Sequence, residues 1–248
     1  MNPGARPNES KLRVGIVTGL ASEAGIIRRY LKSETTATED VWNKGLGCAG
    51  ADPARARALG IDFVESGAIG LVSFGVAGGL DPNRRPGDLV LADEVVPPKG
   101  AAYLTDRDWR EALMREARAA GLDATSGRLL GSDVAVVSRP DKAELFRRHG
   151  ATVVDMESHG VATVAAAAGI PFLVVRAVAD PAARALPRAV LGAVGSDGRA
   201  RAGRVAARLC LSPWELPAVL ALGGDMRRAL NSLTRLLDSG GRTLFGGG

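Results

Sequence analysis

Short apolar runs alternate with amphipathic stretches along most of the chain. Clusters of β-branched and aliphatic residues predict strands at 13–18, 68–74, 88–96, 128–130, 153–154 and 171–178, and extended chain at 134–137. Helical periodicity predicts helices at 21–32, 54–66, 107–120, from Pro140 onward, and at 157–168, 199–211 and 216–238. A glycine-rich turn is predicted at 75–79. Strands that alternate with helices favour an α/β fold whose mostly parallel sheet is covered by helices on both sides.

The predicted elements follow one another without a low-complexity linker or a repeat, so we expect one domain over 1–248, with flexible tails at 1–11 and 239–248. The two helices predicted at 199–211 and 216–238 should cover the sheet. The longest apolar stretch, 161–175, is interrupted by Gly169 and Pro171 and is shorter than the ~20 residues of a membrane span. A buried helix that leads into a buried strand accounts for it.

Composition narrows the function classes. Hydrophobic residues make up 46% of the 248, which excludes global disorder, and aromatics only 4%, which argues against a base-stacking platform for nucleic acid. The formal charge is +5, but the arginines are scattered, so solvated helix faces explain most of it. A weak, peripheral attraction to acidic lipid stays open. Cys48 and Cys210 make neither a disulfide framework nor a zinc site, and the N-terminus carries no signal peptide, so we expect a cytoplasmic protein.

Three acidic residues follow predicted strands: Glu23, Glu157 and Asp180. In open α/β sheets the ligand binds at the carboxyl ends of the strands, so these carboxylates should converge on one rim. Carboxylates are costly to cluster and therefore indicate a functional site. Each alone could equally be an ordinary acid at the start of a helix, and the glycines at 75–79 could simply build a tight turn.

Six segments carry a family resemblance. They are VGIVTGLASE (14–23), GLG (45–47), FGVAGGLDPNRRPGDLVLAD (74–93), GSD (131–133), VVDMESHGVA (153–162) and VVRAVAD (174–180). In this order they resemble the superfamily of purine nucleoside phosphorylases and methylthioadenosine/adenosylhomocysteine nucleosidases. The resemblance implies a phosphorylase/hydrolase-like three-layer α/β/α sandwich with a mixed central sheet, a homo-oligomer, no metal and no cofactor. Its partner would be a purine nucleoside, not nucleic acid.

The resemblance also implies roles for single residues. Asp180 would be the general acid that protonates purine N7 as the base leaves. Glu157 and the backbone at Met156 would bind the ribose hydroxyls, and Glu23 would be the general base that activates water against the anomeric carbon. Four glycines would let the backbone approach the substrate closely: Gly19, Gly75, Gly78 and Gly79.

Departures from the family pattern bear on the nucleophile. The phosphorylase branch tends to carry a phosphate-binding Arg at the position of Glu23, and an Arg and a hydroxyl residue at Ser73 and Val76. Their absence favours hydrolysis. Phosphorolysis, with phosphate as co-substrate held by Arg84, Arg85 or a neighbouring subunit, remains the alternative.

Other departures bear on the substrate. Small residues at 134–136 replace an aromatic that packs on the base, and the stretch between the first helix and Gly45 is short, which would open the ribose 5′ side. The segments 72–82, 180–187 and SPWELP (212–217) resemble the hopanoid-associated phosphorylases, which implies adenosylhopane as substrate and adenine as product. The apolar segment 214–220 would then contact lipid, unless it is a core helix. Alternatives are methylthioadenosine, adenosylhomocysteine or futalosine as substrate, and a nucleoside-binding sensor without activity.

Overall fold

A computed structural model describes residues 14–34 and 45–246. The described chain forms an eight-stranded sheet in the order β2-β1-β3-β7-β6-β4-β5, with β8 paired to β3 and β4. The strands are β1 Val14–Thr18, β2 Leu46–Cys48, β3 Gly70–Gly79, β4 Leu89–Val96, β5 Tyr103–Leu104, β6 Ala124–Gly131, β7 Val153–Asp155 and β8 Phe172–Asp180. The predicted tail at 1–11 and the short stretch before Gly45 lie outside the described residues.

Most strand pairs are parallel, as predicted. The pairs β1–β2, β1–β3, β3–β8, β4–β6 and β6–β7 are parallel, whereas β3–β7, β4–β5 and β4–β8 are antiparallel. These pairings bring β3, β8, β4, β6 and β7 into a closed ring. The carboxyl ends of β1, β3 and β8 meet at one edge because the three run in the same direction.

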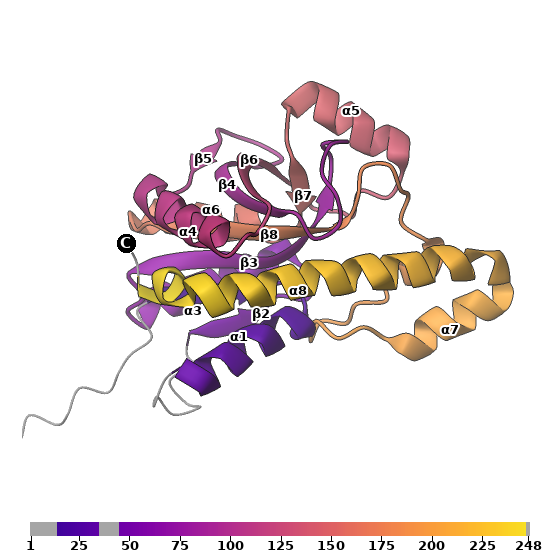
Figure 1. Cartoon of the computed structure of the whole chain (residues 1–248), viewed down its shortest axis with the longest axis horizontal. Helices are drawn as coiled ribbons and strands as arrows, with labels where there is room; N and C mark the ends of the chain where they lie inside the picture. The colour runs from indigo at the N-terminus through magenta and orange to yellow at the C-terminus, as the bar shows by residue number, and fades with distance from the viewer. Residues whose placement is uncertain (1–13, 35–44, 247–248) are drawn as a thin grey trace, which may run out of the picture.

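Helices cover the sheet on both sides, which confirms the three-layer prediction (Figure 1). One apolar cluster joins α1 (Ala21–Glu34), α4 (Arg107–Ala119) and the second half of α8 (Leu216–Gly246) to one face. A second joins α3 (Pro53–Glu65) and α6 (Ser158–Ala168) to the other. Every residue of β8 is buried, as expected for a strand between two helix layers.

Local chemistry sets the helix ends. Asp52 accepts hydrogen bonds from the backbone of Ala54 and Arg55 at the start of α3. Ser138 does the same for Asp141 at the start of α5 (Arg139–His149). Gly169 ends α6 in the left-handed conformation that glycine adopts without strain. These signals explain why the predicted helix positions agree with the structure.

The glycine-rich segment 75–79 is not a turn, contrary to the prediction. The strand β3 runs through it to Gly79 and pairs with β8 on one side, where a bulge lies between Ala77 and Gly78. Gly78 and Gly79 also pair antiparallel with Val154 and Val153 of β7. Glycine in a strand commonly marks a bulge or a close backbone approach, and both occur here. The segment 134–137, predicted as extended, contains no strand.

The predicted frayed tail from Ser239 is also wrong, because α8 continues to Gly246. A Cβ on Gly241 would lie 2.2 Å from the Tyr30 ring, and one on Gly240 would lie 2.7 Å from Leu113. Leu244 is fully buried, and the Trp109 indole donates a hydrogen bond of 2.8 Å to the Thr243 carbonyl. The glycines that suggested fraying instead let the helix lie close against its neighbours.

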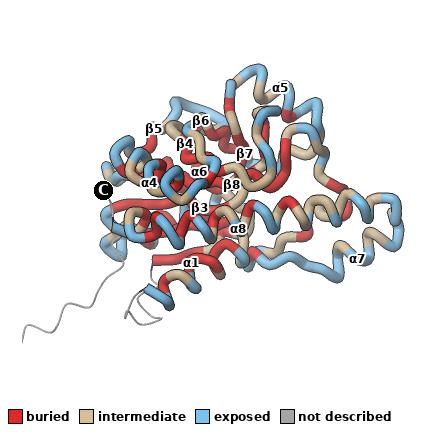
Figure 2. The backbone as a smooth tube through the Cα atoms, in the orientation of Figure 1, coloured by how far each residue is buried: buried red, intermediate tan, exposed pale blue. Residues whose placement is uncertain are grey.

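The helix α7 (Ala202–Leu211) does not cover the sheet, contrary to the prediction. It contains no buried residue and projects with the first turns of α8 beyond the body of the molecule (Figures 1 and 2). We call α7, the short 3-10 helix Pro213–Glu215 and the first half of α8 the C-terminal hairpin. Among the described residues no single helix is long and apolar enough to cross a membrane. The segments Ala202–Leu211 and Pro213–Gly246 meet that criterion only as a pair and are bent by 119° where they meet.

Candidate active site

A cavity of about 910 Å³ opens where β1, β3, β7 and β8 end, as the prediction for the strand ends requires. This volume is near the upper end of the roughly 300–1,000 Å³ that is usual for small-molecule sites. The cavity contacts most of the predicted site residues: Gly19, Glu23, Gly78, Met156, Glu157 and Asp180. The fold therefore brings together three carboxylates that are far apart in the sequence.

Glu23 is held by the start of its own helix. Its Oε2 accepts hydrogen bonds from the backbone of Gly19 and Leu20 at 2.9 and 2.8 Å, and its Oε1 accepts one from Val76 at 2.8 Å. Burial raises the pKa of Glu23, and these hydrogen bonds oppose the rise. Glu23 is thus both a helix-start acid and a residue of the cavity wall, so the two interpretations of its position are compatible.

Glu157 stands at the start of α6, but its side chain makes no capping hydrogen bond there. Burial and then the charge of Asp155 raise the pKa of Glu157 to about 8. Gly19 makes room for this carboxylate, because a Cβ at that position would lie 2.5 Å from Oε1. A carboxylate that is buried without a full set of donors is poised to receive hydrogen bonds from a ligand.

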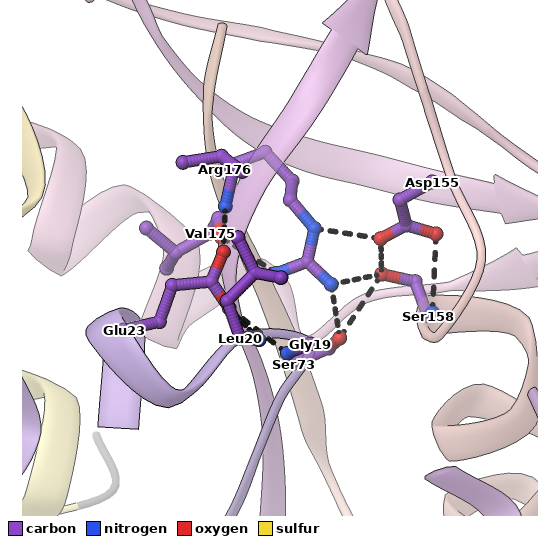
Figure 3. A network of polar contacts seen from close by, with 9 residues as sticks. Gly19, Leu20, Glu23, Ser73, Asp155, Ser158, Val175 and Arg176 are labelled. Atoms are coloured by element: carbon purple, nitrogen blue, oxygen red, sulfur yellow. Dashed lines mark hydrogen bonds and ion pairs between the residues drawn. The ribbon is translucent and has the colours of Figure 1, made fainter. Parts of the chain in front are cut away.

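Arg176 lies beneath the carboxylates, and sequence reasoning missed it. Figure 3 shows its guanidinium pointing toward Asp155, Ser158 and Ser73. Its Nε donates to Asp155 Oδ2 at 2.6 Å, and its Nη2 donates to the Ser73 and Ser158 hydroxyls at 2.5 and 3.0 Å. Its positive charge lowers the pKa of both Glu23 and Glu157. The signal that could have revealed it is a single arginine inside a strand that is otherwise apolar.

Asp180 ends β8 and forms an ion pair that the sequence analysis also missed. Lys142 Nζ, from the first turn of α5, lies 2.5 Å from Asp180 Oδ2, and its side chain is fully buried. Burial raises the pKa of Asp180, and the positive charge of Lys142 opposes the rise. No pattern could have found Lys142, because it is the one buried residue of a helix whose other residues are exposed or half-buried.

Two of the predicted glycines do not line the cavity. Gly75 lies behind Glu23, where a Cβ would come within 2.5 Å of the carboxylate, and Gly79 packs against Val178 and Pro181. One arginine suggested for phosphate, Arg84, is not among the residues that line the cavity. Arg84 pairs with acidic side chains away from the cavity, whereas Arg199 lines it.

The cavity is polar at the strand ends and apolar elsewhere. The apolar wall comes from the loop after β8 and from the C-terminal hairpin, and its larger side chains are Leu186, Val190, Leu191, Val194, Val205, Leu222 and Met226. The small residues of the predicted base pocket, 134–136, complete the wall. Within the described ranges no group of His, Cys, Asp and Glu residues could hold a metal ion.

Comparisons with known proteins identify the family of this chain. The model of the phosphorylase superfamily matches residues 14–210. The chain is 27% identical over 205 residues to a 5′-methylthioadenosine/S-adenosylhomocysteine nucleosidase of Glaesserella parasuis, with 69% of this chain and 86% of that one covered. It is 32% identical over 162 residues to a futalosine hydrolase of Streptomyces coelicolor, with 57% and 68% covered.

Solved structures show the same fold. A 5′-methylthioadenosine/S-adenosylhomocysteine nucleosidase of Neisseria meningitidis, in complex with methylthio-immucillin-A, superposes with a TM-score of 0.66. The identity is 19%, and the alignment covers 91% of this chain and 96% of that one. The futalosine hydrolase of Helicobacter pylori superposes with a TM-score of 0.62, at 18% identity, over 91% of this chain and 97% of that one.

Proposed function

This chain belongs to the phosphorylase superfamily, and on that premise we propose that it cleaves the N-glycosidic bond of a purine nucleoside with a bulky apolar 5′ substituent. It is an enzyme of the nucleoside phosphorylase and nucleosidase family. The observation that carries the proposal is a single cavity with three buried carboxylates at one end and a long apolar wall at the other. A nucleoside bound in this cavity would place its N-glycosidic bond among the carboxylates and its 5′ substituent against the apolar wall.

The proposed chemistry divides among the three carboxylates. Asp180 protonates purine N7, so that the base leaves as a neutral molecule and positive charge develops on the ribose. Glu157, with the backbone of Met156, binds the ribose hydroxyls, and the negative charges of Glu157 and Glu23 stabilise the developing cation. Gly19 and Gly78 carry no side chain, so the protein backbone at these two positions can approach the substrate closely.

Water is the proposed nucleophile, activated by Glu23. Burial raises the pKa of Glu23, which makes its carboxylate a stronger base. Ser73 is engaged by Arg176 and does not line the cavity, and the Val76 backbone is engaged by Glu23, so neither position offers a cation to phosphate. Arg199 at the rim is the residue that would favour phosphorolysis instead.

Adenosylhopane is the proposed substrate, with adenine as the released base. Several relatives carry names that specify 5′-methylthioadenosine and S-adenosylhomocysteine, and the match to the futalosine hydrolase points to futalosine as an alternative substrate. The apolar wall contributed by the hairpin favours the hopanoid, because a fused hydrocarbon ring system would bury against it. Burial stabilises apolar surface by roughly 25 cal/mol per Å².

The hairpin tip supports a peripheral contact with an anionic membrane, from which such a substrate would be taken. Four large apolar residues are exposed there, namely Leu211 at 80%, Trp214 at 74%, Leu220 at 66% and Leu216 at 46%. Between residues 199 and 214 the chain carries four arginines and no acidic residue. Apolar residues flanked by arginine are typical of segments that bind the interface of acidic lipid bilayers.

Flotation with vesicles tests this contact. The protein should float with vesicles that contain phosphatidylglycerol and hardly at all with neutral ones, and Trp214→Ser with Leu220→Ser should remove the binding. Gel filtration of the same samples detects the other occupant of an apolar tip, a second copy of the chain. Loss of self-association in the double variant, without any lipid binding by the wild type, would contradict the membrane contact.

The proposed reaction is tested by adenine release, measured by chromatography, from adenosylhopane and from methylthioadenosine, each with and without phosphate. Release from adenosylhopane without phosphate is the expected result. Release that requires phosphate would mean that phosphate, and not water, is the nucleophile. Arg199 would then be the residue that holds the nucleophile, in place of Glu23. Absence of adenine from both compounds would contradict the proposed reaction.

A further inference from the structure

The buried lysine beside Asp180 has no role in the chemistry described so far. Lys142 Nζ lies 2.5 Å from Asp180 Oδ2, 2.8 Å from the Arg184 carbonyl and 3.2 Å from the Pro181 carbonyl. Its three N–H groups thus find three oxygens, one of them charged. Lys142 does not line the cavity, whereas Asp180 does. The lysine therefore reaches the substrate only through the aspartate.

This pair creates a conflict for an acid catalyst. A lysine cation 2.5 Å away holds Asp180 as a carboxylate, and a carboxylate has no proton to give to a leaving base. Burial, however, penalises both charges of such a pair, and it thereby lowers the cost of the neutral pair that forms when the proton moves across the contact. Burial lowers the pKa of Lys142 and raises the pKa of Asp180, and both effects favour this transfer.

We propose that Lys142 is a positioning residue that stores the proton which Asp180 delivers to N7 of the base. The inference rests on the proposed cleavage of a purine nucleoside. The Nζ–H bond breaks as the O–H bond of Asp180 forms, and the neutral amine keeps its hydrogen bonds to the two carbonyls. Asp180 then passes the proton to N7 while the electron pair of the glycosidic bond goes to the base.

The proton balance closes over one turnover. Water adds its hydroxyl group to the anomeric carbon and loses one proton to Glu23, which releases it to solvent. One proton from solvent restores the Lys142 cation. In the resting state the pair holds one proton between its two members, so the enzyme stays competent at pH values where an isolated carboxylic acid would have lost it.

Few other charges face this pair. Arg184, in the loop after β8, and Asp225 of α8 both act on Asp180, and Asp225 is itself paired with Arg184 and Arg228. Since Asp225 is neutralised by two arginines, Lys142 remains the main charge that sets the protonation of Asp180. The pH dependence of the reaction should therefore respond to substitution of Lys142.

Two variants distinguish a Lys142 that stores a proton from a Lys142 that only holds α5 in place through its ion pair. Lys142→Met removes the proton but keeps the apolar stem, and Lys142→Arg keeps the cation and its hydrogen bonds but cannot release a proton in the working pH range. Adenine release is measured from pH 5 to pH 10 with the adenine nucleoside that the wild type cleaves fastest. Circular dichroism at each pH checks that the variants are folded.

The proposal predicts that Lys142→Met lowers kcat by about 10²–10³ at pH 8 with a smaller change in KM. The alkaline limb of its pH profile should move to lower pH, because Asp180 alone must then hold the proton. Lys142→Arg should be as slow as Lys142→Met, and it serves alone if the methionine variant does not fold. Recovery of the rate by arginine, or an alkaline limb that stays in place, would overturn the proposal. A wild type that releases no adenine would instead overturn the proposed function.

Discussion

The two ends of the cavity are built in opposite ways. At the polar end, the catalytic candidates follow strand ends and are buried, and Glu23 and Asp180 are held by backbone or ionic partners, such as the three N–H donors of Glu23. At the apolar end, the wall comes from a loop and a hairpin, and α7 has no buried residue at all. The first end offers fixed geometry, and the second offers surface that can adapt.

This difference separates reaction from recognition. Proton transfer requires groups to be placed within a fraction of an ångström, and packed strands and helices place side chains more precisely than loops do. Burial of an apolar 5′ group requires area and little direction. A change at the strand ends should therefore affect every substrate, whereas a change in the hairpin should affect only substrates that are long enough to reach it.

The largest expected effect is at Asp180. Asp180→Asn keeps the shape of the side chain but cannot protonate N7, so kcat/KM should fall by about 10²–10⁴ for every purine nucleoside. Asp141→Asn, an exposed position on α5, is the matched control and should be silent. Steady-state adenine release checks both variants. A loss confined to one substrate would mean that Asp180 recognises the substrate and does not take part in the reaction.

The next effect compares the two halves of α8. Leu244→Ala removes a fully buried side chain and should lower the free energy of unfolding by about 2–5 kcal/mol. Leu220→Ala removes a side chain that is 66% exposed and should change it by less than about 0.5 kcal/mol. Urea denaturation followed by circular dichroism measures both. Similar losses in the free energy of unfolding for the two variants would mean that Leu220 is also buried against other residues.

Gly75 and Gly78 provide a matched pair within β3. A Cβ at Gly75 would meet the Glu23 carboxylate at 2.5 Å, whereas a Cβ at Gly78 would meet its closest neighbour, in Val154, at 3.3 Å. Because a displacement of about 1 Å can cost about 100-fold in rate, Gly75→Ala should lower kcat by 10- to 100-fold. Gly78→Ala should cost less. The order of the two kcat values is the test, and the reverse order would contradict the role of Glu23.

The smallest effect concerns stability and pH at Glu157. Its folded-state pKa, about 8, lies above the unfolded value, so its contribution to stability is present at acidic pH and is lost as the pH rises through 8. Glu157→Gln is neutral throughout and avoids that loss. Its Tm should therefore exceed that of the wild type by about 2–4 °C at pH 9, if the gain is about 1 kcal/mol.

At pH 6 the Tm difference should shrink, because the wild-type carboxyl group is then largely protonated. Adenine release should be impaired in this variant chiefly at pH 9, where the wild-type carboxylate carries the negative charge that the amide lacks. Differential scanning calorimetry at the two pH values provides the check. A Tm advantage of Glu157→Gln that is larger at pH 6 than at pH 9 would mean that burial does not raise the pKa of Glu157.

The strand and helix order could be predicted from the sequence because period and end signals agree, as at Ser138 and Gly169. The carboxylates could be predicted because they follow strands. Two glycine-rich segments led to wrong predictions, one of a turn and one of a frayed tail. At 75–79 they mark a strand pressed between two neighbours, and at 240–241 they mark a helix pressed against Tyr30 and Leu113. A glycine reports a close approach, and the sequence does not reveal whether that approach is a turn or a packed backbone.

Arg176 and Lys142 show a second limit. The charge partner of each lies on another element, 21 and 38 residues away along the chain, so no local pattern reports the contact. Arg176 at least interrupts an apolar run. Lys142 sits among polar residues on a helix that looks fully exposed, and only the tertiary structure shows that it is buried beside Asp180.

The most direct test of the division between reaction and recognition is one ratio, kcat/KM for adenosylhopane over kcat/KM for methylthioadenosine. It is measured in the wild type, in Val205→Asp, which places a charge in the apolar wall, and in Ala206→Asp, an exposed neighbour on the same helix. The account predicts that Val205→Asp lowers the ratio by about 10- to 200-fold while methylthioadenosine cleavage and Ala206→Asp stay unchanged. An equal loss for both substrates, or no loss for either, would contradict it.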